Sequence, residues 1–305
     1  MPTLGCPNRF GQAAQLVLDY TFCYVTDSGN HRLVKRKTSD LSYVSKIGSF
    51  GTGNNSFKFP QGICSDGTHL YITDTSNHRV VKRLVSDLSY VSKIGSYGAG
   101  NDQFSQPLSI CTDGNYIYIA DYGNHRIIKR NCSDLSYVSK IGSLGSGNDE
   151  FSGPSGICTD MTYLYITDYG NHRIIKRNCS DLSYVSKIGT EGSGDDQFEY
   201  PIGISYMLGY LFITDTENSR LVKRSRLDLS YVSKIGTEGV GNDQFNNPRG
   251  CWCDTEYVYV TDTCNHRIVK RRMSDLSYVS KIGSSGSGDD QFNLPQCICI
   301  KELLA

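Results

Sequence analysis

Apolar and polar residues alternate over short stretches of the chain. In residues 88–94 the side chains that share one face are Leu88, Tyr90, Ser92 and Ile94. Ser89, Val91 and Lys93 fall on the opposite face. A period of two residues is typical of a β-strand with one buried side. The stretch therefore predicts a short, half-buried strand.

Residues 57–103 contain four stretches of this kind. They are rich in β-branched and aromatic residues and comprise residues 62–65, 70–73, 79–83 and 88–94. The pair Asp66-Gly67 and the polar residues 75–77 are turn signals between them. No part of this unit has a sustained helical period. The pattern predicts four antiparallel strands joined by tight turns.

The whole unit returns every 47 residues without insertion or deletion. The string DLSYVSKIG begins at Asp40, Asp87, Asp134, Asp181, Asp228 and Asp275. Six four-stranded repeats of this length predict an all-β fold, a six-bladed β-propeller. A β-solenoid, the neighbouring alternative, has shorter repeats and fewer hairpins. The repeats leave no room for a second domain, so residues 1–305 are predicted to form one propeller domain.

Most units also share a set of sequence features beyond their strands. These are a Gly-rich segment ending in Gln-Phe, a Pro and a Gly after it, a strand end of the Tyr-Ile-Thr-Asp type and an Asn-His-Arg-Ile segment. With these features the unit resembles the NHL repeat, and the resemblance covers all six units. It implies the propeller fold. It implies little about activity, because propellers carry many unrelated functions.

Residues present in every unit are expected to build the blade rather than to perform chemistry. We predict that the aspartate at the end of the second strand accepts hydrogen bonds from the turn after it. The asparagine of this turn is expected to adopt a left-handed backbone conformation. The arginine is expected to pair with that aspartate or with the equivalent aspartate of the next blade. In the second and third units these structural residues are Asp74, Asn77, Arg79, Asp121, Asn124 and Arg126. The Gln-Phe ring is expected to fill the gap between blades.

Histidines and cysteines follow the same period. Five histidines share one position, namely His31, His78, His125, His172 and His266. Equivalent turns lie too far from the axis for their imidazoles to meet at one zinc ion, so we predict no metal and no cofactor. The cysteines occupy periodic positions without partners, which favours free thiols and a reducing, cytoplasmic compartment. Three Asn-X-Ser acceptor patterns weigh against that interpretation.

A specialised site in such a repetitive chain is expected where the sequence departs from the period. Departures are concentrated in the last three units and include Glu191, Glu217, Glu238, Arg249 and Trp252, the only tryptophan. Loops between blades and turns after the second strand share one face of a propeller. We therefore expect Glu191, Glu217, Glu238 and Arg249 to lie near one another on that face. The alternative explanation is that the sequences of exposed loops have diverged without any functional consequence.

Charge and hydropathy limit the function. Lys plus Arg and Asp plus Glu both number 31, which counts against nucleic-acid binding through bulk charge. No apolar run approaches the length of a membrane-spanning helix, and no secretion signal is visible. A monomeric, non-catalytic scaffold that binds a protein or a glycan through the loop-rich face is the favoured function. The alternatives that the resemblance implies are a lactonase- or lyase-like enzyme with a metal at the axial channel, and RNA binding.

Closure of the ring presents a conflict between the two ends of the chain. Residues 292–300 begin a seventh unit whose strand would be the innermost strand of the first blade. Residues 16–19 fit the same place. We expect the ends to overlap in blade one and the C-terminal strand to close the ring.

Overall fold

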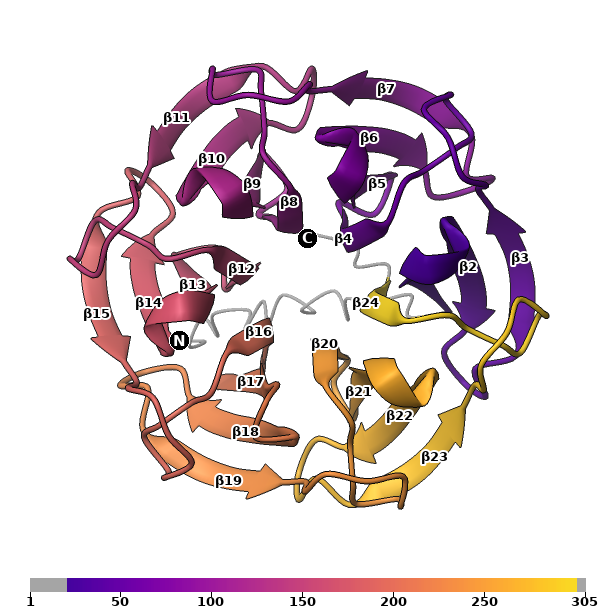
Figure 1. Cartoon of the computed structure of the whole chain (residues 1–305), viewed down its shortest axis with the longest axis vertical. Helices are drawn as coiled ribbons and strands as arrows, with labels where there is room; N and C mark the ends of the chain where they lie inside the picture. Colours follow the sequence, from indigo (N-terminus) through magenta and orange to yellow (C-terminus); the bar gives the residue numbers. More distant parts are fainter. Residues whose placement is uncertain (1–20, 301–305) are drawn as a thin grey trace, which may run out of the picture.

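The strands of the chain form a ring of six sheets around a central axis (Figure 1). This computed structural model describes residues 21–300, and in that range each sheet has four antiparallel strands. The predicted six-bladed propeller is therefore confirmed. Within the described range no helix is long and apolar enough to cross a membrane.

Each blade runs outward from an innermost strand beside the axis. Blade one consists of β24 (Pro295–Ile300), β1 (Phe22–Asp27), β2 (Arg32–Lys37) and β3 (Tyr43–Ile47). Blade two consists of β4 (Pro60–Ser65), β5 (His69–Asp74), β6 (Arg79–Leu84) and β7 (Tyr90–Ile94). Blade three consists of β8 (Pro107–Thr112), β9 (Tyr116–Asp121), β10 (Arg126–Asn131) and β11 (Tyr137–Ile141). Blade four consists of β12 (Pro154–Thr159), β13 (Tyr163–Asp168), β14 (Arg173–Asn178) and β15 (Tyr184–Ile188). Blade five consists of β16 (Pro201–Met207), β17 (Tyr210–Asp215), β18 (Arg220–Ser225) and β19 (Tyr231–Ile235). Blade six consists of β20 (Pro248–Cys253), β21 (Tyr257–Asp262), β22 (Arg267–Arg272) and β23 (Tyr278–Ile282).

The core lies between neighbouring blades rather than at the axis. In β5, Leu70, Tyr71 and Ile72 are fully buried, because this strand is covered by a blade on each side. The outermost strand β7 alternates between half-buried and exposed residues, as its period of two predicts. The ring of Phe104 fills the space between blades two and three, where it packs with Tyr71 and Ile119. The phenylalanine of the Gln-Phe segment thus fills the gap between blades, as the sequence predicts.

The C-terminal strand supplies the innermost position of blade one. Strand β24 pairs antiparallel with β1, with Val25 opposite Ile298 and Tyr24 opposite Cys299. The ring is consequently closed by a sheet that joins the two ends of the described chain (Figure 1). Residues 16–19, the competing segment, lie outside the described residues.

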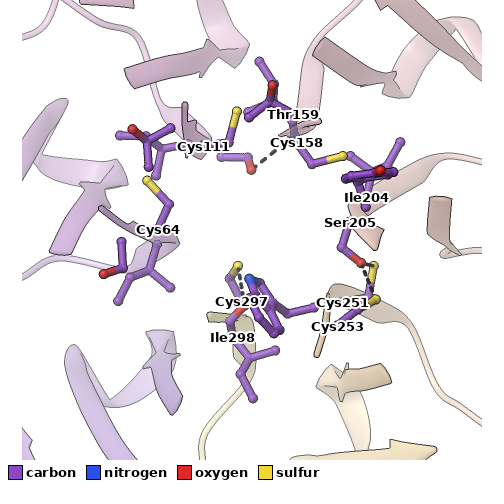
Figure 2. A pocket seen from close by; sticks show the side chains of 18 residues that line it. Cys64, Cys111, Cys158, Thr159, Ile204, Ser205, Cys251, Cys253, Cys297 and Ile298 are labelled. Atoms are coloured by element: carbon purple, nitrogen blue, oxygen red, sulfur yellow. Dashed lines mark hydrogen bonds between the residues drawn. The ribbon is translucent and has the colours of Figure 1, made fainter. Parts of the chain in front are cut away.

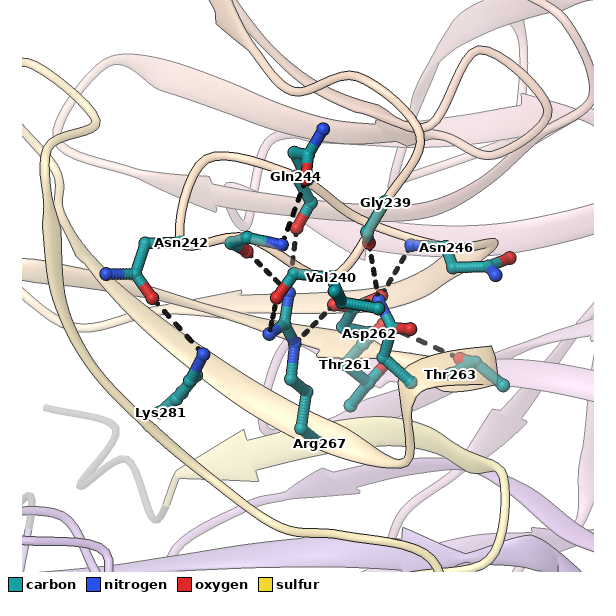
Figure 3. Close-up of polar contacts among 12 residues, drawn as sticks. Gly239, Val240, Asn242, Gln244, Asn246, Thr261, Asp262, Thr263, Arg267 and Lys281 are labelled. Atoms are coloured by element: carbon teal, nitrogen blue, oxygen red, sulfur yellow. Dashed lines mark hydrogen bonds and ion pairs between the residues drawn. The ribbon is translucent and has the colours of Figure 1, made fainter.

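A buried Asp–Arg pair fixes the turn between the second and third strands of every blade. In blade six, Arg267 Nε lies 2.6 Å from Asp262 Oδ2, and Asn265 donates to the same oxygen at 2.9 Å. Arg267 also donates to Val240 O at 2.6 Å, in the loop between blades five and six (Figure 3). The pair lies within one blade, and the arginine attaches the loop that arrives from the preceding blade.

The left-handed residue of this turn differs from the prediction. In blade two the positive φ belongs to His78 (52°), whereas Asn77 ends the 3-10 turn η2 (Thr75–Asn77). The asparagine side chain is instead held by Asp74 Oδ2 and Gly51 O. Asn77 is therefore selected for its amide donors and not for its backbone conformation, and the assignment of the left-handed position to the asparagine was wrong.

Candidate binding surface on the loop-rich face

The innermost strands enclose a narrow axial channel lined by thiols and small residues. A cavity of about 100 Å³ lies at the level of residues 63–65 and their equivalents (Figure 2). Its cysteines are Cys64, Cys111, Cys158, Cys251, Cys253 and Cys297. Trp252 also lines it, so this sequence-predicted residue lies inside the channel. A second space of about 50 Å³ continues towards the start of the strands.

Burial favours the protonated form of the channel thiols Cys64, Cys111, Cys158, Cys251 and Cys297. Burial raises the pKa of Cys251 to about 12 and that of Cys297 to about 11. The hydroxyl of Ser205 lies 3.1 Å from Cys253 Sγ and 3.5 Å from Cys251 Sγ (Figure 2). Nine cysteines of the described range, Cys251 and Cys297 among them, are free thiols. Because a thiol reacts as its thiolate, these groups are expected to be inert in the folded protein.

Alkylation of the native protein is expected to begin at Cys264. This residue of η5 (Thr263–Asn265) is the exposed cysteine of the described range, whereas the others are buried or half-buried. Treatment with iodoacetamide at pH 8, followed by peptide mapping, should label Cys264 first and the channel thiols only after denaturant is added. Cys264→Ser, which copies Ser76 of blade two, should abolish the early label. Early labelling of Cys251, or a disulfide in the purified protein, would contradict this expectation.

The channel does not offer the donors that a metal-dependent enzyme would need. No carboxylate or imidazole is among the residues that line its two cavities. Among residues 21–300, no three His, Cys, Asp or Glu side chains are arranged to hold a metal ion. The residues present therefore do not fit the axial metal that the enzyme alternative implies.

The channel opens on the loop-rich face, which we define as the face carrying the loops between blades and the turns after the second strands. A cavity of about 240 Å³ lies at this mouth. It is lined by Gln61, Leu108, Tyr122, Ser155, Tyr169, Ile202 and Arg249. Gln61, Leu108, Ser155, Ile202 and Arg249 occupy one repeat position, directly after the proline that begins each innermost strand. We call this space the channel-mouth cavity.

Two tyrosines form one wall of the channel-mouth cavity. Tyr122 begins η3 (Tyr122–Asn124) and Tyr169 begins η4 (Tyr169–Asn171), and their ring centroids are 6.1 Å apart in an edge-to-face arrangement. Gly153 makes room for the first ring, because a Cβ on this residue (φ 67°) would lie 2.5 Å from Tyr122 Cε2. The tyrosine and the glycine are thus paired departures from the repeat.

Arg249 occupies the same cavity and is held by neutral groups. Its Nε donates to Asn247 Oδ1 at 2.8 Å, and its Nη1 lies 3.4 Å from Gln296 Oε1. Asn247 also donates to Glu217 Oε1 at 3.1 Å. The pKa of Tyr169 is raised, chiefly by burial and then by Tyr122, while the charge of Arg249 acts in the opposite direction. Arg249, Glu217 and Tyr169 therefore belong to one electrostatic environment.

The expected acidic cluster forms only in part. Glu217 and Arg249 are connected through Asn247, as described above. Glu191 and Glu238 are exposed at the outer part of the same face, and no contact joins either carboxylate to Arg249 in the described residues. Their backbone carbonyls accept hydrogen bonds from Gln197 and Gln244 within their own loops. The expected proximity of all four residues thus holds for one pair.

Large apolar side chains are exposed on the opposite half of the loop-rich face. Phe50, Tyr97 and Leu144 are 64%, 71% and 65% exposed. They share the repeat position that Glu191, Glu238 and Ser285 occupy in the other units, and all six make the same backbone bridge to a phenylalanine seven residues later. The fold therefore does not require an apolar side chain here. We call Phe50, Tyr97 and Leu144 the apolar arc.

The periodic histidines have a structural function on this face. Nδ1 of His125 accepts a hydrogen bond from the backbone N–H of Gly153 at 3.0 Å, and His78 accepts one from Gln106 at 3.1 Å. Each histidine thereby connects its turn to the segment that leads into the next blade.

Comparison with known families agrees with this architecture. The model of the NHL repeat matches residues 57–82 and 104–129, which lead into and form blades two and three. The chain is a six-bladed propeller with NHL repeats in blades two and three. A search of curated proteins found no match to its sequence.

Solved structures share the fold of the NHL propeller at low sequence identity. A chain from a crystal structure of a nidogen–laminin complex is 14% identical, with a TM-score of 0.70 over 92% of this chain and 98% of its own length. A functionally unknown protein from Desulfotomaculum acetoxidans DSM 771 is also 14% identical, with a TM-score of 0.57 over 90% and 84% of the two chains. At this identity the similarity concerns the fold alone.

Sequence reasoning missed two parts of the NHL propeller's loop-rich face. Tyr122 and Tyr169 stand where the other units have Ser or Thr, but because they occur in consecutive blades they resemble repeat residues. Glu191 and Glu238 stand out against the apolar residues of the first three units, which hides the apolar arc as a feature in its own right. Both the tyrosine pair and the apolar arc are found by asking which side chain the fold requires at each repeat position, instead of which residue is most frequent there.

Proposed function

We infer that the NHL propeller is a non-catalytic recognition scaffold that binds a partner protein through the apolar arc. The observation that supports this function is the exposure of Phe50, Tyr97 and Leu144 at one repeat position of three consecutive units. Single exposed apolar residues are normal, whereas a set ordered on one face favours a protein interface. The position tolerates Glu and Ser elsewhere in the ring, so folding alone does not explain the arc.

The two halves of the face suggest the chemistry of the partner. Beyond the arc, Glu191 and Glu238 present negative charge at the same repeat position. A partner that is apolar where it meets blades one to three and basic where it meets blades four and five would complement this surface. The nidogen–laminin structure provides a precedent for the fold within a protein complex. The free cysteines support a reducing, cytoplasmic location.

Substitutions taken from the repeat itself can test the apolar arc. The variant Phe50→Ser, Tyr97→Ser, Leu144→Ser copies Ser285, and its thermal stability should match that of the wild type. Tagged protein is incubated with an extract of the producing cells, and bound proteins are quantified by mass spectrometry. At least one protein should be enriched on the wild type and depleted about tenfold or more on the arc variant, since loss of interface anchors costs more than 1 kcal/mol each.

The matched control alters exposed valines of the same region. Val44→Ser, Val91→Ser, Val138→Ser changes side chains of the outermost strands β3, β7 and β11, away from the loops. The control should retain the partner. Equal capture by the arc variant, or equal loss in both variants, would refute recognition through the arc.

A further inference from the structure

The channel-mouth cavity contains an arginine without an acidic partner. Other arginines near this face have one: Arg220 Nε and Arg267 Nε each lie 2.6 Å from an aspartate. Among the described residues no carboxylate is within ion-pair distance of Arg249, whose guanidinium donates to two amide oxygens. A guanidinium has five N–H donors, so donors remain for a ligand. A half-buried arginine of this kind favours a planar anion such as a carboxylate.

The remaining walls favour a polyhydroxylated ligand. Tyr122 and Tyr169 present aromatic surface, which attracts the weakly positive C–H hydrogens of a sugar ring. The side-chain amide of Gln61 lines the cavity and has no hydrogen-bond partner among the described protein atoms. An amide can both donate to and accept from a hydroxyl group. Aromatic, amide and guanidinium groups therefore converge on one space.

A peptide carboxylate fits this space less well. Peptide termini are typically captured by clusters of free backbone N–H groups. Here the N–H groups of Gly156 and Gly250 donate to Thr167 Oγ1 and Thr261 Oγ1, at 2.6 and 2.7 Å. The N–H groups of Gly62, Gly203 and Cys297 are engaged in the same way with threonine hydroxyls. Five of the six equivalent N–H groups are thus engaged, which leaves recognition in the cavity chiefly to side chains.

We propose that the channel-mouth cavity binds a sugar that carries a carboxylate, as a terminal uronic acid residue does. Arg249 holds the carboxylate, Tyr169 and Tyr122 contact the ring, and the Gln61 amide binds a hydroxyl group. The volume of about 240 Å³ is smaller than that of most drug-sized pockets, which limits the site to one sugar unit. This site is separate from the apolar arc and does not depend on protein binding there.

Calorimetric titration of the full chain with small glycosides tests the proposal. Methyl β-D-glucuronide provides ring and carboxylate, methyl β-D-glucoside provides the ring alone, and acetyl-diglycine provides a peptide carboxylate. We expect glucuronide binding in the roughly millimolar range. Because a charge-assisted hydrogen bond is lost with the neutral sugar, the glucoside should bind at least about tenfold more weakly. Acetyl-diglycine should not compete.

The repeat provides variants that the fold already accommodates. Arg249→Gln copies Gln61 and Gln296, and it should remove the preference for glucuronide over glucoside. Tyr169→Thr copies Thr75, and it should weaken the binding of both sugars. Val91→Ser, on the outermost strand β7 and outside both proposed sites, is the control and should leave both affinities unchanged.

Each alternative result overturns the uronic acid site. Equal affinity for the two glycosides, or a preference that survives in Arg249→Gln, would exclude carboxylate recognition by this arginine. Tighter binding of acetyl-diglycine would assign the cavity to a peptide terminus. Absence of binding to all three probes at millimolar concentration would refute a sugar site while leaving the apolar arc untouched.

Discussion

Asp121→Ala should destabilise the propeller by about 3–5 kcal/mol, because it leaves a buried guanidinium without its counterion. Asp121 is fully buried and accepts hydrogen bonds from Arg126 Nε at 2.7 Å, Asn124 Nδ2 at 2.8 Å and the backbone N–H of Ser105 at 2.7 Å. Arg126 is itself 5% exposed. Removing the carboxylate therefore breaks three hydrogen bonds at once and leaves the Arg126 guanidinium buried without a counterion.

The loss of stability in Asp121→Ala should extend to the loop between blades two and three. Arg126 also donates to the carbonyls of Ala99, Gly100 and Gln103, in the segment that connects blades two and three. In repeat proteins stability is approximately a sum of unit and interface contributions, so this junction should open first. Urea unfolding measures the change in free energy, and amide hydrogen exchange should show faster exchange in residues 96–107 than in the equivalent loop after blade four.

An acidic residue one turn of the loop away provides the control. Asp102 is paired with Arg130 at 2.8 Å, but its side chain is 69% exposed, so the pair is largely screened by water. Asp102→Asn copies Asn55 of the preceding unit and should alter stability little. If Asp121→Ala proved as mild as Asp102→Asn, the buried pair would not be the structural element that we describe.

The fold could be predicted from the sequence because its determinants are local and repeated. The alternating stretch DLSYVSKIG occurs six times at a constant spacing, so an error in the assignment of one unit is corrected by the others. The conformation of single turn residues was harder to assign. Asn77 has the higher left-handed propensity, but Asp74 and Gly51 require its amide, and the positive φ passes to His78.

The candidate site could be predicted only in part, because its residues meet across several blades. A carboxylate at position 217 and a guanidinium at position 249 are connected through Asn247, which no periodic argument singles out. The pairing of Tyr122 with Gly153 likewise depends on the distance between a turn and the next innermost strand. Departures from a period identify candidate residues, whereas only the ring geometry shows which of them share a cavity.

Ring closure illustrates the same limit, since two segments of the chain suit one strand position. Residues 16–19 and residues 298–300 both continue the repeat pattern, and local propensity does not distinguish them. The register decides in favour of β24, which places Ile298 opposite Val25 and fully buries its side chain. Asn293 N also donates to Asp27 Oδ1 at 2.7 Å, so the approach to β24 completes the turn network of blade one.

Truncation after Asn293 should therefore abolish the cooperative unfolding transition of the propeller. It removes β24, exposes the edge of β1 and uncovers the core around Cys23 and Val25, a loss comparable with the whole stability of a typical domain. Because a truncated chain can fail to fold for reasons other than ring closure, Ile298→Ala tests the same closure with a smaller change. Because this side chain is fully buried, Ile298→Ala should lower the free energy of unfolding by about 2–5 kcal/mol.

Matched variants separate ring closure from ordinary core packing. Ile204→Ala removes the same group at the same repeat position of β16, inside a blade whose strands are continuous in sequence. Truncation after Ile300 leaves β24 in place and should preserve thermal stability. If the chain ending at Asn293 melted like the full chain, another segment, residues 16–19 in the first instance, would occupy the innermost position of blade one. Ile298→Ala would then be nearly neutral while Ile204→Ala remained costly, and this difference between the two variants would identify the strand that closes the ring.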